Sequence, residues 1–176
     1  NFKLNEKDIL SNQDWTFPTT TYYGPGRFNE IGKFCEEFDI KNPLIVTDSG
    51  SKDLPFIKKL IALLSKNNIK SDLFYNISPN PRDDEISKGC DQFKNGSHDS
   101  IIAIGGGSAM DGGKSICLTV NSETPLWDFE FEQPVPKITK ENAFPKIITI
   151  PTTAGTGAET EITAMVTHLE KGMKFC

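Results

Sequence analysis

Residues 101–115 read IIAIGGGSAMDGGKS, and this stretch decides the fold. Its apolar start does not alternate with polar residues, which suits a strand covered on both faces in the centre of a parallel sheet. Three glycines follow, and residues 108–119 can continue as a helix. A P-loop requires glycine where Ser108 stands, and the dinucleotide fingerprint GxGxxG requires glycine where Met110 stands. The stretch therefore predicts a strand, a glycine turn and a helix without satisfying either pattern.

The glycines in this stretch suggest two kinds of close approach. Backbone N–H groups of residues 105–107 can converge on an anion at the positive end of the helix dipole, because no side chain intervenes. The simpler alternative is a turn that only reverses the chain. Gly112 and Gly113 lie inside the expected helix, where each costs about 1 kcal/mol relative to alanine. We therefore expect backbone or ligand to approach the helix closely there.

The segments around this stretch alternate between strand and helix patterns. Apolar residues at three- and four-residue steps indicate helices, and short β-branched runs bounded by turn residues indicate strands. This alternation predicts an α/β fold with a doubly wound, mostly parallel, Rossmann-like sheet, forming one dinucleotide-binding domain over residues 1–176. The expected strands are 17–24, 42–50, 71–78, 100–108 and 146–150, the expected helices are 25–38, 54–67, 82–93 and 108–119, and residues 162–175 resemble a hairpin.

Composition excludes several classes of protein. The chain has 176 residues and a formal net charge of -5, and its lysines and arginines are scattered, so nucleic acid is not an expected partner. No apolar run approaches a membrane span, and residues 1–10 lack the apolar core of a signal peptide. The cysteines form no CxxC pair, which indicates reduced thiols in a cytoplasmic protein. They are Cys35, Cys90, Cys117 and Cys176.

Ligands of doubly wound sheets bind beyond the carboxyl ends of the strands, where we expect three loops: 48–50, 105–108 and 152–157. Asp48 is suited to accept hydrogen bonds from a ribose diol and to repel a 2′-phosphate, although a turn-forming role explains it almost equally well. The third loop offers hydroxyl and amide groups for phosphate or ribose, or forms only a threonine-rich turn. Its candidates are Thr152, Thr153, Thr156 and Gly157.

The histidines and the acidic pairs do not indicate a metal site. His98 and His168 are the two histidines of the chain, so three histidine ligands cannot be assembled. We expect His98 in a surface loop and His168 in the hairpin, with structural or solvated roles. Asp83 and Asp84 are expected to be solvated acids at the start of a helix, where they favour the helix dipole.

Five motifs in the same order resemble the amino-terminal domain of the iron-containing (group III) alcohol dehydrogenases. They are YYGPGRFNEIG, LIVTDSG, PNP, IIAIGGGSAMDGGKS and IPTTAGTGAETE, and they extend over nearly the whole chain. The resemblance implies a nicotinamide cofactor lying across the carboxyl end of the sheet, and Asp48 favours NAD over NADP. It also implies a small-molecule alcohol or aldehyde as the substrate of the longer enzyme, and a homodimer is a further expectation.

The resemblance also implies roles for individual residues. The loop of Gly106, Gly107 and Ser108 would hold the pyrophosphate, and Asp48 would hold the adenosine ribose. Other residues would flank the cofactor (Asn80), line its phosphate and nicotinamide side (Thr152 and Thr156), lie near the nicotinamide ribose (Lys174) or support the glycine turn (Asp111 and Lys114).

The chain departs from the family pattern at Gly112 and Gly113, where small non-glycine residues are usual, and at Ala158, where serine is common. The family's second, helical domain supplies an aspartate and three histidines that bind Fe2+ or Zn2+, and the sequence stops before them. We therefore expect the chain alone to bind cofactor without catalysing the reaction. The alternatives are a glycerol-dehydrogenase-like or dehydroquinate-synthase-like protein of the same superfamily, or a non-catalytic nucleotide-binding or dimerisation module.

Overall fold

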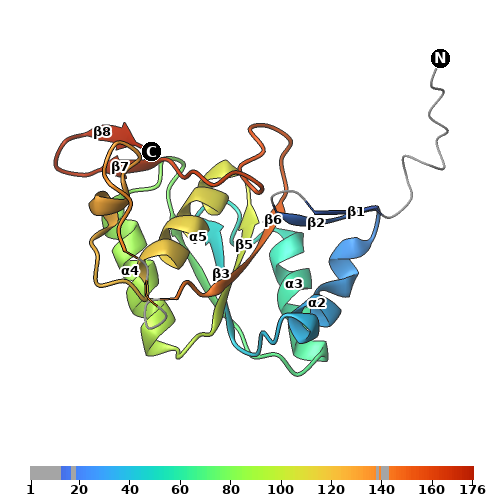
Figure 1. The fold of residues 1–176 in the computed structure, drawn as a ribbon. Helices are drawn as coiled ribbons and strands as arrows, with labels where there is room; N and C mark the ends of the chain where they lie inside the picture. The colour runs from blue at the N-terminus through green and yellow to red at the C-terminus, as the bar shows by residue number, and fades with distance from the viewer. Residues whose placement is uncertain (1–12, 17–18, 138, 140–142) are drawn as a thin grey trace, which may run out of the picture.

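A parallel sheet forms the centre of the molecule (Figure 1). The computed structural model describes residues 13–16, 19–137, 139 and 143–176, with only the backbone described for 13–16. Within them a four-stranded sheet has the order β4-β3-β5-β6, and every neighbouring pair is parallel. The strands are β3 (Pro43–Asp48), β4 (Asp72–Ile77), β5 (Ser100–Gly105) and β6 (Lys146–Pro151). The predicted α/β fold with a mostly parallel sheet is confirmed.

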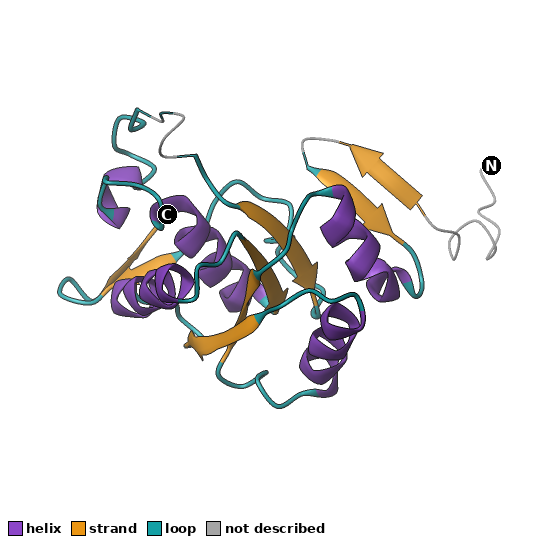
Figure 2. Ribbon diagram, turned by 90° about the horizontal axis from the view of Figure 1, so that it is seen from below, coloured by secondary structure: helices purple, strands orange, loops and turns teal. Residues whose placement is uncertain are grey.

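Helices cover both faces of the sheet, as the doubly wound prediction requires (Figure 2). The helices α2 (Ile31–Glu37) and α3 (Pro55–Lys66) share one apolar core with Ile45, Ile102 and Ile104. The helices α4 (Asp83–Asn95) and α5 (Gly107–Thr119) share the other core with Leu44, Val46, Ile101 and Ala103. Successive residues of β3 and β5 thus enter opposite cores.

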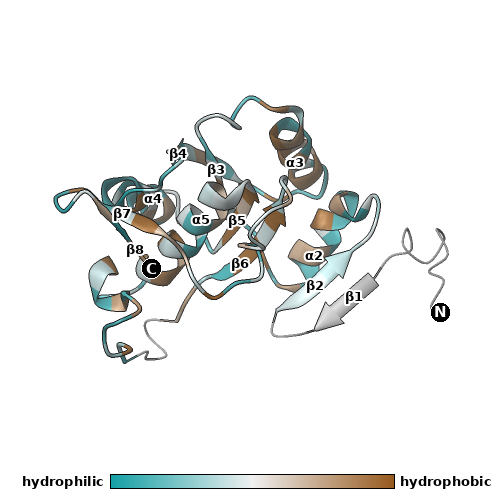
Figure 3. Ribbon diagram, turned by 90° about the horizontal axis from the view of Figure 1, so that it is seen from above, coloured by the Kyte–Doolittle hydropathy of each residue, from teal (hydrophilic) through white to brown (hydrophobic). Residues whose placement is uncertain are grey.

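This two-sided burial explains why residues 101–104 are continuously apolar. All six residues of β5 are buried, and the strand appears as a hydrophobic element between the helices (Figure 3). Burying an isoleucine side chain stabilises the fold by about 1.5–3 kcal/mol. A polar residue on either face would lose this contribution, because neither face meets solvent.

Smaller elements surround the central sheet. A strand that the sequence did not predict, β1 (Gln13–Thr16), pairs antiparallel with β2 (Thr20–Tyr23); the predicted strand began at 17, and residues 17–18 lie outside those described. Two 3-10 turns, η1 (Arg27–Glu30) and η2 (Leu126–Phe129), lie in connecting segments. The predicted carboxyl-terminal hairpin is confirmed as β7 (Val166–His168) and β8 (Met173–Phe175).

His98 is buried at the amino ends of the strands, so the expectation of a surface position is wrong. Its Nδ1 lies 2.9 Å from the carbonyl oxygen of Asn42, and its Nε2 lies 3.2 Å from Oδ2 of Asp72. The ring also packs against Phe93, at 5.9 Å between centroids. Its sequence neighbours suggested a loop, but the loop folds its histidine inward against segments distant in sequence.

The structure also bears on two expectations drawn from composition. No helix in the described part of the chain combines the length and apolarity needed to cross a membrane. All four cysteines are free thiols, as predicted. Burial raises the pKa of Cys35 to about 11 and that of Cys117 to about 12, so both are protonated near neutral pH.

Candidate cofactor-binding site

Four loops leave the sheet at the carboxyl ends of its parallel strands. They are residues 48–51 after β3, 78–82 after β4, 105–108 after β5 and 152–157 after β6. Because β5 lies between β3 and β6, its glycine loop lies between the loops that begin at Asp48 and Thr152. The topology thus brings the predicted binding segments to one edge of the sheet.

The glycine loop combines one crowded position with one open position. Gly105 has φ +145°, and a Cβ atom added there would lie 2.8 Å from Ala109 Cβ and 3.0 Å from Asp48 Oδ2. A Cβ atom added at Gly107 would meet no atom within 4 Å. Helix α5 begins at this open position, and no side chain caps its N-terminus. Its first N–H groups therefore remain available for an anion.

The loop after β6 lies directly against the glycine loop. The backbone N–H of Thr152 donates to the Gly105 carbonyl at 2.9 Å. A Cβ atom added at Gly106 would lie 3.4 Å from Oγ1 of Thr153. Thr152, Thr153 and Thr156 are all exposed, and Ser108 is half-buried at the start of α5. The structure thus places the Thr153 hydroxyl and the Thr152 backbone beside the glycine loop.

Asp48 serves its own loop and still has acceptor capacity. Its Oδ1 accepts the N–H of Gly50 at 3.1 Å, and its Oδ2 accepts the hydroxyl of Ser51 at 2.8 Å. The turn-forming role considered for this residue is therefore present. An ionised carboxylate has about four acceptor sites, so these two bonds leave room for a diol. The turn and the binding role do not exclude each other.

A buried carboxylate that the sequence did not reveal organises the loop containing Asn80. Glu85 is 5% exposed, and its Oε2 accepts the backbone N–H groups of Ser78 at 3.2 Å and Arg82 at 3.0 Å. The Ser78 hydroxyl donates to the Asn80 carbonyl at 2.7 Å. Glu85 is the third residue of α4, a position typical of a capping box. That spacing was a usable signal, weakened because Arg82 replaces the usual serine or threonine.

Lys114 does not point at the glycine loop as a P-loop lysine would. Its Nζ donates to the carbonyls of Ala158 at 2.8 Å, Glu161 at 3.3 Å and Thr163, and it lies 3.6 Å from Asp111 Oδ1. An ammonium group has three donors, so the three carbonyls use them all. Lys114 therefore fastens the 158–163 segment to α5.

Asp111 is half-buried beside Lys114. Burial raises the pKa of its carboxyl group, although a hydrogen bond from the Met165 backbone and the charge of Lys114 oppose the shift. Ala158, where serine is common in the family, is 7% exposed and belongs to the core beside α5. Its methyl group packs there without needing a hydrogen-bond partner.

Gly112 and Gly113 pack against the sheet. A Cβ atom added at Gly112 would lie 2.8 Å from Ile77 Cδ1, and one added at Gly113 would lie 2.5 Å from Ala103 Cβ. The expected close approach is present, and the approaching group is protein. These glycines let α5 lie close to β4 and to β5, and β5 is the strand that the glycine loop follows.

Lys174 lies in the hairpin, whose other strand touches the Asn80 loop. Lys174 pairs with Thr167 across the hairpin, and the Thr167 N–H donates to the Pro81 carbonyl at 2.7 Å. The Lys174 side chain is exposed. The structure thus brings the hairpin to the loop after β4, but it shows no direct contact between Lys174 and the glycine loop.

His168 has a structural role, whereas Asp83 is less solvated than expected. The His168 ring stacks on Trp127, with centroids 4.6 Å apart and planes 9° apart, so its expected structural role is observed. Asp83 does begin α4, but its Oδ2 accepts the Trp127 Nε1–H at 3.1 Å. The description of Asp83 as a solvated charge is therefore wrong, because a distant segment folds back onto it.

Metal-binding clusters and cavities also bear on the candidate site. No group of three or more histidine, cysteine or acidic side chains that could hold a metal occurs among the described residues. A mostly apolar cavity of about 330 Å³ lies elsewhere, beside Cys117 and Leu118 of α5, lined also by Trp127 and Phe175. Its lining includes none of the predicted cofactor-binding residues.

The doubly wound, mostly parallel sheet with helices on both faces (Figure 2) defines a domain of the α/β class. Residues 18–176 match the family described as iron-containing alcohol dehydrogenase, so the chain belongs to that family. This confirms the resemblance found in the sequence.

Known relatives are longer than this chain. The chain is 29% identical over 164 residues to 1,3-propanediol dehydrogenase of Klebsiella pneumoniae, covering 92% of this chain and 41% of that protein. The fold of this chain matches the crystal structure of a 1,3-propanediol oxidoreductase with a TM-score of 0.78 and 30% identity, over 86% of this chain and 38% of that protein. Sulfoacetaldehyde reductase from Bifidobacterium kashiwanohense, solved in complex with NAD+, matches with a TM-score of 0.75 and 27% identity, over 86% and 39% of the two chains.

Proposed function

We propose that this chain is the NAD-binding, amino-terminal domain of a two-domain, metal-dependent alcohol dehydrogenase or aldehyde reductase. The open space in front of Gly107, at the uncapped start of α5, is the observation that carries the proposal. A pyrophosphate fits such a position, since backbone N–H groups and the helix dipole both favour negative charge. The relative solved with NAD+ supports the choice of cofactor.

The described residues fit the cofactor in three parts. Gly106, Gly107 and Ser108 would hold the pyrophosphate, and Asp48 would accept hydrogen bonds from the adenosine ribose. Thr152, Thr153 and Thr156 would line the far side of the glycine loop, Asn80 would flank the cofactor, and Lys174 would lie near the nicotinamide ribose. When bound, the nicotinamide accepts or supplies the hydride that interconverts an alcohol and an aldehyde.

The metal part of the family's chemistry does not fit the described residues, which contain no suitable ligand set. We therefore assign no catalytic step to this chain and propose that it is inactive alone. Fe2+ or Zn2+, and the small-molecule alcohol or aldehyde, would require a second domain. The free cysteines support a cytoplasmic location.

Preference for NAD over NADP is part of the proposal and rests on Asp48. Its carboxylate lies at the end of β3, 3.0 Å from where a Cβ atom of Gly105 would be. A 2′-phosphate placed there would meet a like charge and lose hydrogen bonds to the diol. Replacing Asp48 with glycine should relax the discrimination between the two cofactors.

Titration calorimetry with NAD+, NADP+ and ADP tests the proposal. Gly107→Ala is the informative variant because its methyl group meets no protein atom within 4 Å, so the fold tolerates it. We expect it to weaken NAD+ and ADP at least about tenfold, the equivalent of about 1.4 kcal/mol. Ser65→Ala, an exposed change at the other end of the sheet, is the control. Failure of the unaltered chain to bind any of these ligands at millimolar concentration would refute the proposal.

A further inference from the structure

Asp83, the first residue of α4, binds two segments that are distant in sequence. Its Oδ2 accepts the Trp127 Nε1–H at 3.1 Å, and its Oδ1 lies 3.3 Å from the backbone N of Leu169, which donates to it. The His168 Nδ1 lies 3.6 Å from the same Oδ2. The side chain of Asp83 is only 22% exposed. One carboxylate thus joins the start of α4 to the turn η2 and to the end of β7.

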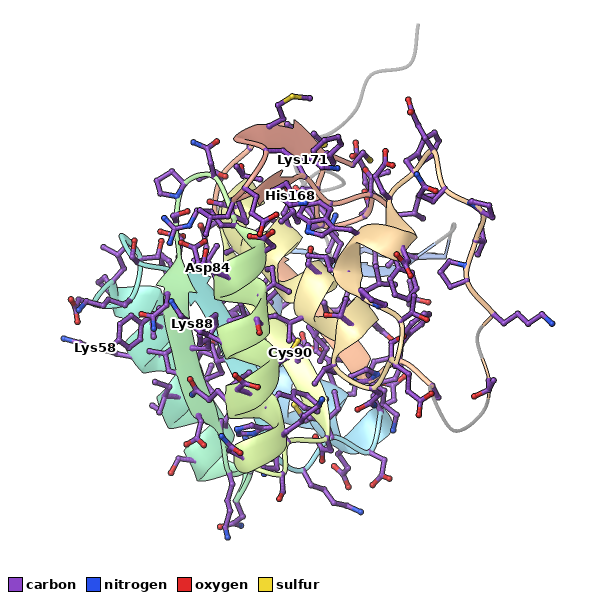
Figure 4. The ribbon with its side chains drawn as sticks, turned by 90° about the vertical axis from the view of Figure 1, so that its left-hand side faces the viewer. Lys58, Asp84, Lys88, Cys90, His168 and Lys171 are labelled. Atoms are coloured by element: carbon purple, nitrogen blue, oxygen red, sulfur yellow. The ribbon has the colours of Figure 1, made fainter. Side chains whose placement is uncertain are left out.

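Aromatic contacts reinforce this junction on one face of the hairpin. The rings of His168, Trp127 and Phe175 form a cluster, with centroids 4.6 Å apart for Trp127 and His168, 5.8 Å for Trp127 and Phe175, and 6.3 Å for His168 and Phe175. Figure 4 shows His168 above the N-terminal end of α4, close to Asp84. Because cross-strand partners share a face and neighbours alternate, the pair Val166–Phe175 faces this junction.

Lys174 belongs to the opposite face. Its partner across the hairpin is Thr167, whose N–H donates to the Pro81 carbonyl at 2.7 Å. The hairpin is attached to α4 through its aromatic face. This attachment also fixes the position of Lys174 on the opposite face. Asp83 supplies the acceptor for the N–H of Leu169, the residue directly after β7, so the hairpin cannot shift along α4 without losing that bond.

We propose that Asp83 is a positioning residue for cofactor binding: it holds the β7–β8 hairpin so that Lys174 reaches the nicotinamide ribose of the dinucleotide. This inference rests on the proposed function, in which Lys174 lies on the nicotinamide side of NAD. Asp83 does not touch the cofactor. It acts through the hairpin, so its removal affects the nicotinamide half of the ligand and spares the adenosine half.

The test compares NAD+ with ADP, which lacks the nicotinamide ribose, by titration calorimetry on the whole chain. Asp83→Asn keeps the size of the side chain but leaves one acceptor oxygen for the two donors. We expect it to weaken NAD+ about threefold to tenfold, the effect of one lost hydrogen bond, with ADP affinity unchanged. Asp91→Asn, the same change on the exposed part of α4, is the matched control and should alter neither affinity.

A double-mutant cycle separates positioning from general destabilisation. Lys174→Met should weaken NAD+, and adding Asp83→Asn should then cause little further loss, because the hairpin no longer carries the contact. Equal weakening of NAD+ and ADP by Asp83→Asn would overturn the inference, as would an unchanged NAD+ affinity in Lys174→Met. If the unaltered chain binds neither ligand, the proposed function itself fails.

Discussion

Gly113→Ala probes the packing of α5 on the sheet. The added Cβ atom would lie 2.5 Å from Ala103 Cβ, in the central strand β5. Two carbon atoms in contact normally lie about 3.5–4.0 Å apart, so the helix and the strand must separate by about 1 Å. Ala103 is completely buried and its Cβ moves only with the backbone. The strain therefore cannot be relieved by a rotamer change.

Two opposing terms set the magnitude. Replacing glycine by alanine in the middle of a helix stabilises it by about 1 kcal/mol. Overpacking a well-filled core typically costs about 1–3 kcal/mol, and a rigid backbone neighbour places this site near the upper end. We expect a net loss of about 2 kcal/mol. For a chain of this size the melting temperature should fall by about 4–8 °C.

Urea unfolding followed by circular dichroism measures the loss, and a second substitution identifies its cause. Ala103→Gly removes the methyl group that the new alanine meets. Together the two changes should destabilise the chain by at least about 1 kcal/mol less than the sum of the single changes. If Gly113→Ala is neutral or stabilising, or if the two effects simply add, the close approach between α5 and β5 does not limit the packing.

Three further predictions concern side chains away from this contact. At pH 8, Cys176 should react with iodoacetamide in the native chain, because it is exposed. Cys117 should react only after unfolding, because burial raises the pKa of its thiol to about 12. Mass spectrometry measures the labelling of each cysteine. Lys114→Met should destabilise the chain by about 3 kcal/mol in urea, since it removes the charged donor from three carbonyls, and an unchanged urea midpoint would contradict this. The hydrogen bond from Arg82 holds the pKa of Asp84 below its usual value, so its contribution to stability is present above about pH 4 and is lost as the pH falls through the lowered pKa. Asp84→Asn should therefore reduce the acid sensitivity of the urea midpoint, by a small amount because the pair is partly solvated.

Those parts of the fold that depend on local pattern were predictable from the sequence. The unbroken apolar run at 101–104 indicated a strand buried on both faces, and β5 is completely buried. Helix α3 shows three-residue and four-residue apolar steps, and its Ile57, Leu60 and Leu64 face the core. Strand β1 was missed because it has only four residues, and pairing with β2 rather than a strong apolar pattern defines it.

Contacts between segments that are distant in sequence could not be predicted from the sequence. Asp83 resembled a solvated helix-start acid, but Trp127 and Leu169 reach it from far along the chain. His98 resembled a surface loop residue, but it is buried and its ring contacts Asn42 and Asp72. Polar side chains near turns have similar local sequence patterns whether they face solvent or a buried partner. Residue type alone therefore could not distinguish a solvated position from a buried one.

The glycines of α5 show why one residue type must be interpreted position by position. At Gly113 an added methyl group meets Ala103, so the requirement for glycine comes from the protein itself. At Gly107 the same methyl group meets nothing within 4 Å, so the packing of the protein does not require glycine there. A bound ligand that occupies this space would explain the glycine. Stability and affinity should therefore separate: Gly113→Ala lowers the free energy of unfolding, whereas Gly107→Ala leaves it unchanged and weakens the dinucleotide. A loss of stability in Gly107→Ala, with NAD+ affinity intact, would show that this glycine serves the turn alone.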